Sequence, residues 1–479
     1  MKIDLFYWRN RNMKNIDLKQ TESCCSSPSI KHEINIQPTT ASRHLPVAII
    51  GAGPIGLAAA ANLVERGENF ILLESGTNVG HNISDWGHVR LFSPWQYNVD
   101  KAAARLLSQH GWSSPSPDEL PTGQQLLDNY LLPLANLEDI KSQLILNTKV
   151  IGISRKDTDK MKSQLRDGNP FVIYADERGT LQRYEAKAVI DATGTWGHSN
   201  PLYASGILTN EEQSLSANIY YGIPNIQGKD KQRYIGKSIA VVGGGHSALN
   251  TLLDLAQLKE SNPEMNIMWI MRKNRVEEAY GGEANDQLEA RGELGTRIHQ
   301  LVNSEQIQVV TPFRIQKLSR LAEKITISGV YKTESRDLQG IDEIIVNTGS
   351  RPDFSFLHEL RLSIDQATES IETLAPLIDP NVHSCGTVRP HGERELRHSE
   401  KDFYIVGMKS YGRAPTFLMA TGYEQVRSVV AYLAGDYKAA EKVELDLPET
   451  GVCSINNSPT KEKESSCTPI PATNSSCCS

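Results

Sequence analysis

Short apolar runs alternate with helical patterns from about residue 45 to about residue 440. The run at 47–50 (VAII) precedes a glycine-rich turn, an alanine-rich helix predicted to end near Arg66, and a second run, FILLE, that ends at Glu74. Further apolar runs follow at 188–191, 238–242, 267–271 and 344–346. Alternating strands and helices favour parallel sheets covered by helices, so the pattern predicts an α/β fold.

The first glycine-rich turn has the form of a dinucleotide fingerprint. It reads Gly51-Ala52-Gly53-Pro54-Ile55-Gly56. Gly51 permits the tight turn, Gly53 lets backbone N–H groups approach a pyrophosphate, and Gly56 lets helix and strand pack closely. Glu74 lies eighteen residues after Gly56, where a carboxylate can accept the ribose hydroxyls. The alternative is a glycine-rich turn with no ligand.

The same feature occurs a second time. After the run at 238–242, the turn reads Gly243-Gly244-Gly245-His246-Ser247-Ala248, and a helix is predicted through about Leu258. The next run, 267–271, ends in Arg272 and Lys273 instead of an acid. Cations at this place suit the 2′-phosphate of NADP, whereas an acid suits an unphosphorylated ribose. Arg272, Lys273 and Arg275 could alternatively form an ordinary solvated charge run.

This repeat predicts two Rossmann-like dinucleotide-binding domains, the second inserted in the first. We expect the first domain to comprise 46–205 and 346–440, and the second to comprise 206–345. Strands that break at Thr193-Gly194 and Thr348-Gly349 mark the crossings between them. The polar segments 1–45 and 441–479 are predicted to be disordered tails.

Charge and hydropathy narrow the possible partners. The chain of 479 residues carries a net charge of −7, so it has no overall basic field for nucleic acid or anionic lipid. The long apolar stretch 47–64 is interrupted by glycines and Pro54, which indicates strand, turn and helix instead of a membrane span. The N-terminus shows no apolar secretion signal, so a cytoplasmic protein acting on a small molecule is expected.

Cysteine usage argues against a disulfide framework. Of seven cysteines only Cys385 lies in the body, and the others lie near the two ends, at 24, 25, 453, 467, 477 and 478. Cys385 has His383, His391 and His398 nearby, but no zinc spacing appears, and no metal site is predicted. The tail cysteines could bind a soft metalloid such as As(III), or belong to neutral Ser/Cys-rich tails.

Together these motifs carry a resemblance. The two turns, Glu74, the Ala-Thr-Gly at 192–194, the Thr-Gly-x-Arg-Pro at 348–352 and a helix after Tyr411 resemble the two-dinucleotide-domain flavoproteins over about 45–435. Within them the chain is similar to the flavin-containing monooxygenase branch. The stretches 86–95 and 408–425 also look like flavoproteins of arsenical-resistance gene clusters.

This resemblance implies FAD in the first domain and NADPH in the second. It implies a monooxygenase that oxidises a soft nucleophile, such as a trivalent arsenical, with oxygen through a C4a-hydroperoxyflavin. Disulfide reductases of this fold carry a redox cysteine pair, and this body has none. Two other departures are the segment 214–225, which lacks the monooxygenase FxGxxxH linker, and Met408, which stands where relatives have an Asp.

Two alternatives to the monooxygenase therefore stay open. One is an NAD(P)H-dependent flavin reductase that acts on a thiol or metalloid without oxygen insertion. The other is a flavoprotein that binds metalloids through its tails. The resemblance also suggests residues near the flavin: Arg90 and Trp95 as catalytic candidates, Ser93, Thr193, Gly194, Gly349 and Gly407 as cofactor contacts, and the helix after Gly412. Cys385, from the His/Cys cluster, is a third catalytic candidate as a thiolate that captures a soft metalloid, or else a buried thiol in a surface loop. Core packing and loop capping are the alternative roles for the residues at 90–95.

Overall fold

Two five-stranded parallel sheets organise the chain. The computed structural model describes residues 44–286, 288–380, 391–414 and 417–445. The first sheet has the order β16-β7-β1-β2-β3, and all its pairs are parallel. Its strands are β1 (Val47–Ile50), β2 (Phe70–Leu73), β3 (Leu144–Ile145), β7 (Ala188–Asp191) and β16 (Phe403–Ile405). The predicted α/β fold class is confirmed.

The second sheet repeats the arrangement of four of these strands, but its edge strand β8 comes first along the chain, whereas β16 comes last in the first sheet. Its order is β11-β10-β9-β15-β8, again with every pair parallel. Its strands are β8 (Ile219–Tyr221), β9 (Ser238–Val242), β10 (Asn266–Ile270), β11 (Gln308–Val310) and β15 (Glu343–Val346). The predicted domain boundaries at 205, 345 and 440 stay predictions, and the predicted tails lie almost wholly outside the described residues.

The registers relate the two sheets residue by residue. Asp191 pairs with Ile50, the residue before the first glycine turn, and Val346 pairs with Val242, the residue before the second. The segment 191–194 therefore occupies the place in the first sheet that 346–349 occupies in the second. The two Thr-Gly breaks fall at matching ends of matching strands.

The chain also forms two three-stranded antiparallel sheets, which the sequence pattern did not predict. One contains β4 (Thr148–Arg155), β5 (Phe171–Glu177) and β6 (Thr180–Ala186). The other contains β12 (Phe313–Leu321), β13 (Lys324–Tyr331) and β14 (Glu334–Ile341). Helices were expected to cover the parallel sheets, but part of this cover consists of strands.

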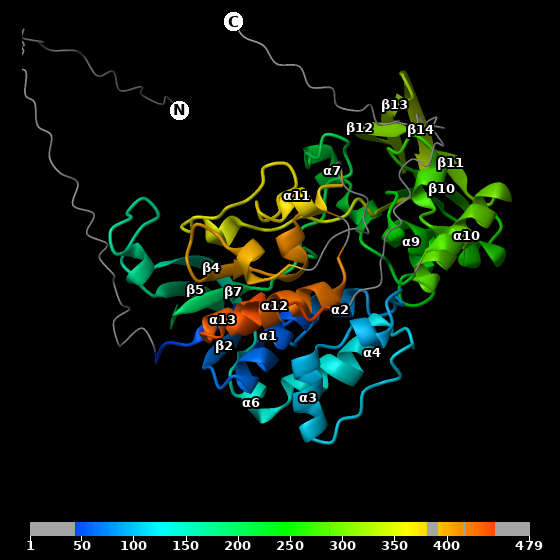
Figure 1. Ribbon diagram of the computed structural model, residues 1–479. Helices are drawn as coiled ribbons and strands as arrows, with labels where there is room; N and C mark the ends of the chain where they lie inside the picture. The colour runs from blue at the N-terminus through cyan, green and yellow to red at the C-terminus, as the bar shows by residue number, and fades with distance from the viewer. Residues whose placement is uncertain (1–43, 287, 381–390, 415–416, 446–479) are drawn as a thin grey trace, which may run out of the picture. The chain divides into compact units, whose positions relative to one another are not determined.

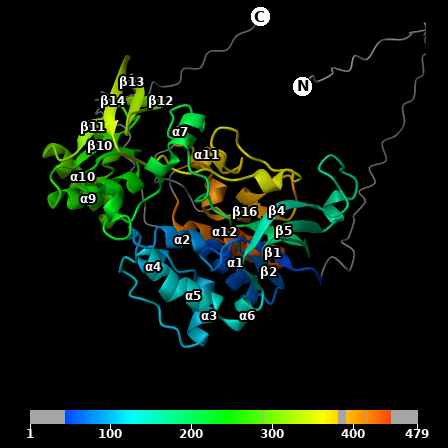
Figure 2. The same ribbon diagram turned by 180° about the vertical axis from the view of Figure 1, so that it is seen from behind.

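Most of the α-helices are short. The helices are α1 (Pro54–Glu65), α2 (His81–Asp85), α3 (Lys101–Gln109), α4 (Gly123–Leu126), α5 (Leu132–Ala135), α6 (Glu138–Lys141), α7 (Asn210–Ser214), α8 (Lys231–Tyr234), α9 (His246–Glu260), α10 (Glu289–Asn303), α11 (Ala375–Ile378), α12 (Met419–Leu433) and α13 (Tyr437–Glu441). No helix among the described residues is long and apolar enough to cross a membrane. Helix α1 lies beside α12, next to β1 and β2 (Figure 2).

Side-chain alternation explains how the second sheet is covered. Ile239 and Val241 of β9 belong to the core shared with α9, whereas Ala240 and Val242 belong to the core shared with β12 and β13. Helices α9 and α10 lie together near β10, with the β12–β14 sheet also beside it (Figure 1). A strand buried on both faces reads as a continuous apolar run, as residues 239–242 (IAVV) of β9 do.

Candidate functional site

The first glycine-rich turn is shaped by two close backbone approaches and one open position. Gly51 has φ +95°, and a Cβ there would lie 2.9 Å from the Ala192 carbonyl oxygen. At Gly56 a Cβ would lie only 1.8 Å from the Gly51 oxygen, so α1 packs against β1 as closely as backbone allows. A Cβ on Gly53, the N-cap of α1, would meet no atom within 4 Å. The helix N-terminus is thus open to an approaching anion, as the fingerprint predicts.

Glu74 follows β2 and is buried against this turn. Its carboxylate accepts hydrogen bonds from the backbone N–H groups of Ala52 and Gly76, both at 2.7 Å. The Ser75 hydroxyl donates a longer bond to Glu74 Oε1 at 3.4 Å. These three bonds fix the acid beside the turn and use three of about four acceptor positions of a carboxylate. The remaining position is available to a ribose hydroxyl.

A buried ion pair lies at the ends of β7 and β16, and the sequence analysis missed it. Lys409 Nζ donates to Asp191 Oδ2 at 2.6 Å and to Thr193 Oγ1 at 3.0 Å, and both charged side chains are fully buried. Asp191 Oδ1 in turn accepts from the Thr193 backbone N–H and hydroxyl. Phe356 covers the ammonium, with its ring centroid 4.5 Å from Nζ. The pair therefore ties the Thr193-Gly194 turn to the segment after Met408.

Gly407 belongs to a second buried network in the same region. Its N–H donates to Gln425 Oε1 at 2.7 Å, and its φ of +70° excludes most side chains. Gln425 Nε2 lies 2.9 Å from both Ser410 Oγ and His391 Nε2. Gln425 comes from α12, which begins at Met419, later than the helix predicted to follow Gly412. Polar groups in this buried place therefore satisfy one another.

The second glycine-rich turn resembles the first in shape. Gly243 has φ +139°, and a Cβ there would lie 2.2 Å from the Asn347 carbonyl oxygen. Gly245 is the N-cap of α9, and the space beside it is open. Ala248 holds the place of Gly56 and is fully buried. His246 and Ser247 are the first two residues of α9, whose N–H groups have no intrahelical partner.

Burial determines the protonation state of His246 at this second turn. Desolvation, with a smaller contribution from the Arg291 cation, lowers the pKa of His246 to about 4, so its ring is neutral at pH 7. Asn347 Nδ2 donates to the Gly222 oxygen, while its buried Oδ1 has no partner among the described residues. An unpaired buried acceptor beside an open helix N-terminus fits a ligand that brings both a phosphate and a hydrogen-bond donor.

The cations after β10 differ in their surroundings. Arg272 is exposed and makes no hydrogen bond or ion pair in the described part of the chain. Lys273 is half-buried and donates to the Glu278 carbonyl at 2.6 Å. Arg275 lies 3.9 Å from Glu278 at the surface. The predicted cluster therefore consists of residues with distinct environments.

The predicted flavin-pocket residues are mainly engaged in local structure. Arg90 is exposed and donates to the Leu120 carbonyl, Ser93 Oγ bonds to Asn98 Oδ1, and Trp95 is 4% exposed within the core of the first sheet. Their catalytic and cofactor roles stay predictions. Phe92, which the sequence analysis did not single out, lies 5.3 Å from the His246 ring. Its aromatic side chain within the stretch 86–95 was the sequence feature that could have marked Phe92 as a candidate.

The His/Cys cluster gives no metal site where it can be described. Cys385, His383 and the tail cysteines lie outside the described residues. His391 contacts Gln425, and His398 Nδ1 accepts from the Ser363 N–H at 3.1 Å. Within residues 44–445, apart from the undescribed segments, no group of three potential metal-binding side chains converges.

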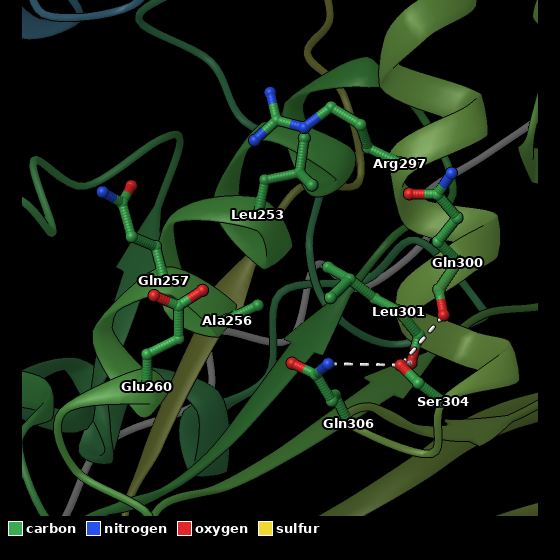
Figure 3. A pocket seen from close by; sticks show the side chains of 9 residues that line it. All are labelled: Leu253, Ala256, Gln257, Glu260, Arg297, Gln300, Leu301, Ser304 and Gln306. Atoms are coloured by element: carbon green, nitrogen blue, oxygen red, sulfur yellow. Dashed lines mark hydrogen bonds between the residues drawn. The ribbon is translucent and has the colours of Figure 1, made fainter.

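A hollow of about 530 Å³ lies between the C-terminal halves of α9 and α10 (Figure 3). It is lined by Leu253, Ala256, Gln257, Glu260, Arg297, Gln300, Leu301, Ser304 and Gln306. Because the glycine-rich turn lies at the opposite end of α9, this hollow is separate from the predicted cofactor site.

Comparisons with known proteins agree with this geometry. The model of a family described as pyridine nucleotide-disulphide oxidoreductase matches residues 48–385. A ferredoxin–NADP reductase of Streptococcus pyogenes serotype M3 is 23% identical over 373 residues, which are 77% of this chain and 90% of that protein.

Solved structures of two different activities share the fold. Bacillithiol disulfide reductase Bdr (YpdA) from Bacillus cereus superposes with a TM-score of 0.60 at 19% identity, covering 82% of this chain and 99% of that one. The FAD-bound cadaverine monooxygenase DfoA from Erwinia amylovora gives 0.58 at 14% identity, covering 84% and 98%. At such identities the likeness establishes the fold and leaves the reaction open.

Proposed function

Because the chain belongs to the pyridine nucleotide-disulphide oxidoreductase family, we propose that it is an NADPH-dependent FAD monooxygenase of a soft nucleophile. The first turn with Glu74 would hold FAD, and the second turn with Arg272 and Lys273 would hold NADPH. When bound, FAD supplies the chemistry that accepts hydride from NADPH and reacts with oxygen. The chain's own residues would bind, orient and shield these groups.

The cysteine content of the chain argues against a disulfide reductase. The body from 44 to 445 contains the single cysteine Cys385, so it has no cysteine pair to receive electrons beside a flavin. Electrons must therefore pass to an acceptor outside this body. Oxygen with a small oxidisable substrate is one such acceptor, and DfoA, a monooxygenase, shares this fold.

The overall reaction would balance with NADPH as the electron donor. One atom of oxygen is inserted into the lone pair of the substrate, the other leaves as water, and NADPH becomes NADP⁺ with uptake of one proton. A trivalent arsenical is the substrate class we propose, on the sequence resemblance of 86–95 and 408–425 to flavoproteins of arsenical-resistance clusters. A cytoplasmic location and metalloid binding by the tail cysteines stay predictions.

A reductase for an external acceptor is the second candidate. The segment 214–225 lacks the monooxygenase linker, and its residues 219–221 form β8, the edge strand paired with β15. The ferredoxin–NADP reductases that match 77% of the chain support this alternative.

Rapid mixing distinguishes the two candidates. The FAD-loaded protein would be reduced anaerobically with NADPH and mixed with ¹⁸O₂, with and without a trivalent arsenical, while flavin absorbance and product mass are followed. The monooxygenase predicts arsenical-dependent reoxidation and one ¹⁸O atom in the product. Reoxidation indifferent to the arsenical, with no label in the product, would move the assignment to the reductase.

A further inference from the structure

The side chain of Lys273 runs along the second glycine-rich turn. A Cβ built on Gly244 would lie 3.1 Å from Lys273 Cε and 3.3 Å from Cδ, so the lysine stem occupies the space beside the middle glycine. This places the stem against the turn itself. A residue reserved for the ribose end of a cofactor would not need this contact.

Both ends of Lys273 are held in place. Its ammonium donates to the Glu278 carbonyl at 2.6 Å, and its own carbonyl accepts from the Thr311 hydroxyl. An ammonium has three N–H donors, and within the described residues only this one bond uses them. Two donors thus stay available beside an open helix N-terminus.

Other cations near the turn are differently engaged. Arg272 is exposed and unpaired within the described residues, and Arg291 is held in a two-bond pair with Asp286 at 2.7 Å. His246 is neutral at pH 7 because burial lowers its pKa. Lys273 is therefore the cation best placed to add positive charge at the turn.

We propose that Lys273 binds the pyrophosphate of the nicotinamide cofactor, and that Arg272, not Lys273, binds the 2′-phosphate. Lysine binds phosphate as a compact point charge and needs no bidentate geometry. This division of roles separates affinity for any nicotinamide dinucleotide from preference for NADPH. The proposed role of Lys273 rests on NADPH as the cofactor, but it does not depend on whether the final electron acceptor is oxygen or another molecule.

Binding measurements on the FAD-loaded full chain test the proposal. NADP⁺ carries both the pyrophosphate and the 2′-phosphate, whereas 2′-AMP carries only the latter. Each is titrated calorimetrically, with 2′-AMP also measured by its competition against NADP⁺. Lys273→Gln is expected to weaken NADP⁺ about tenfold and leave 2′-AMP unchanged, since a charge-assisted hydrogen bond is lost. Arg272→Gln is expected to weaken both.

Two controls separate a loss of phosphate binding from a loss of folding. Lys273→Arg retains the charge and should recover most of the NADP⁺ affinity, and FAD content with thermal unfolding shows whether each variant is folded. Equal weakening of NADP⁺ and 2′-AMP by Lys273→Gln, or no effect on either, would overturn the proposal. Failure of the unmodified protein to bind NADP⁺ would instead remove the proposed function.

Discussion

The two glycine-rich turns occupy matching places in two parallel sheets, yet the charged residues around them are arranged in opposite ways. At the first turn the charges are buried: Glu74 bonds to backbone N–H groups, and Asp191 pairs with Lys409. At the second turn the residue in register with Glu74 is Met271, which is buried, and the exposed Arg272 follows it. The residue in the place of Asp191 is Val346, which is apolar and 2% exposed.

This difference distinguishes a binding site whose charged groups are already held by the protein from one whose charged groups are exposed to solvent. Charges that are locked by protein partners hold the first turn in one shape, which suits a cofactor that stays bound. Unpaired surface cations suit a cofactor that arrives and leaves, since they attract phosphate without a rearrangement of the protein. The tighter approach at Gly56, where the second turn has Ala248, fits the same contrast.

The largest effect is expected from breaking the buried pair. Lys409→Met leaves the Asp191 carboxylate buried without its cation, and such a change typically lowers the free energy of unfolding by about 3–5 kcal/mol. FAD content should fall as well, because the pair fixes the Thr193-Gly194 turn. Urea unfolding and bound-FAD absorbance measure the two effects.

Two variants check this assignment. The exposed Lys401→Met serves as the matched control and should change neither quantity. Adding Asp191→Asn to Lys409→Met removes the uncompensated charge, and part of the stability should return. A single Lys409→Met variant as stable as Lys401→Met would show that the first turn does not depend on its buried charge.

The sequence predicted the fold and the two turns because glycine spacing and apolar runs are local signals. It predicted Gly51, Gly243 and the two Thr-Gly breaks at the places where the structure brings them together. It missed Lys409 because its partner, Asp191, lies 218 positions away along the chain. One hint existed: each charge stands at the end of an apolar run, where an unpaired charge would be costly.

The antiparallel sheets were missed for a related reason. Strands β4–β6 and β12–β14 carry exposed polar positions, and their sequences resemble the connecting segments between apolar runs. The separate role of Lys273 could not be predicted either. Whether a surface lysine turns toward a glycine or toward solvent depends on the Glu278 and Thr311 contacts, which come from the fold.

Exchanging the third small residue of each turn sharpens the comparison. Gly56→Ala would place a methyl carbon 1.8 Å from a backbone oxygen, so α1 must shift, at a cost of about 1–3 kcal/mol or more. The reciprocal Ala248→Gly only adds backbone freedom, which costs about 0.5–1 kcal/mol. Denaturant unfolding with FAD content compares them. Similar losses for the two variants would contradict the tighter packing of the first turn.

The charged residues that follow β2 and β10 should also differ in their effect on stability. Glu74→Ala leaves the backbone N–H groups of Ala52 and Gly76 without their acceptor, at about 1–3 kcal/mol of stability. Arg272→Ala removes an exposed side chain that has no partner among the described residues, and the free energy of unfolding should change by no more than about 0.5 kcal/mol. Thermal unfolding of both proteins without added nucleotide is the measurement. A large loss with Arg272→Ala would mean that it is part of the structure.

The smallest effect concerns acid pH at the second turn. The pKa of His246 is lowered by burial from 6.5 to about 4. Between these values the unfolded chain binds more protons than the folded one, so this residue makes stability fall as pH falls through that window. His246→Gln should flatten that slope in urea unfolding, whereas the exposed His110→Gln is the control. An unchanged slope would mean that His246 can hold a proton in the folded protein. The charge at the second turn would then not come from the residues after β10 alone.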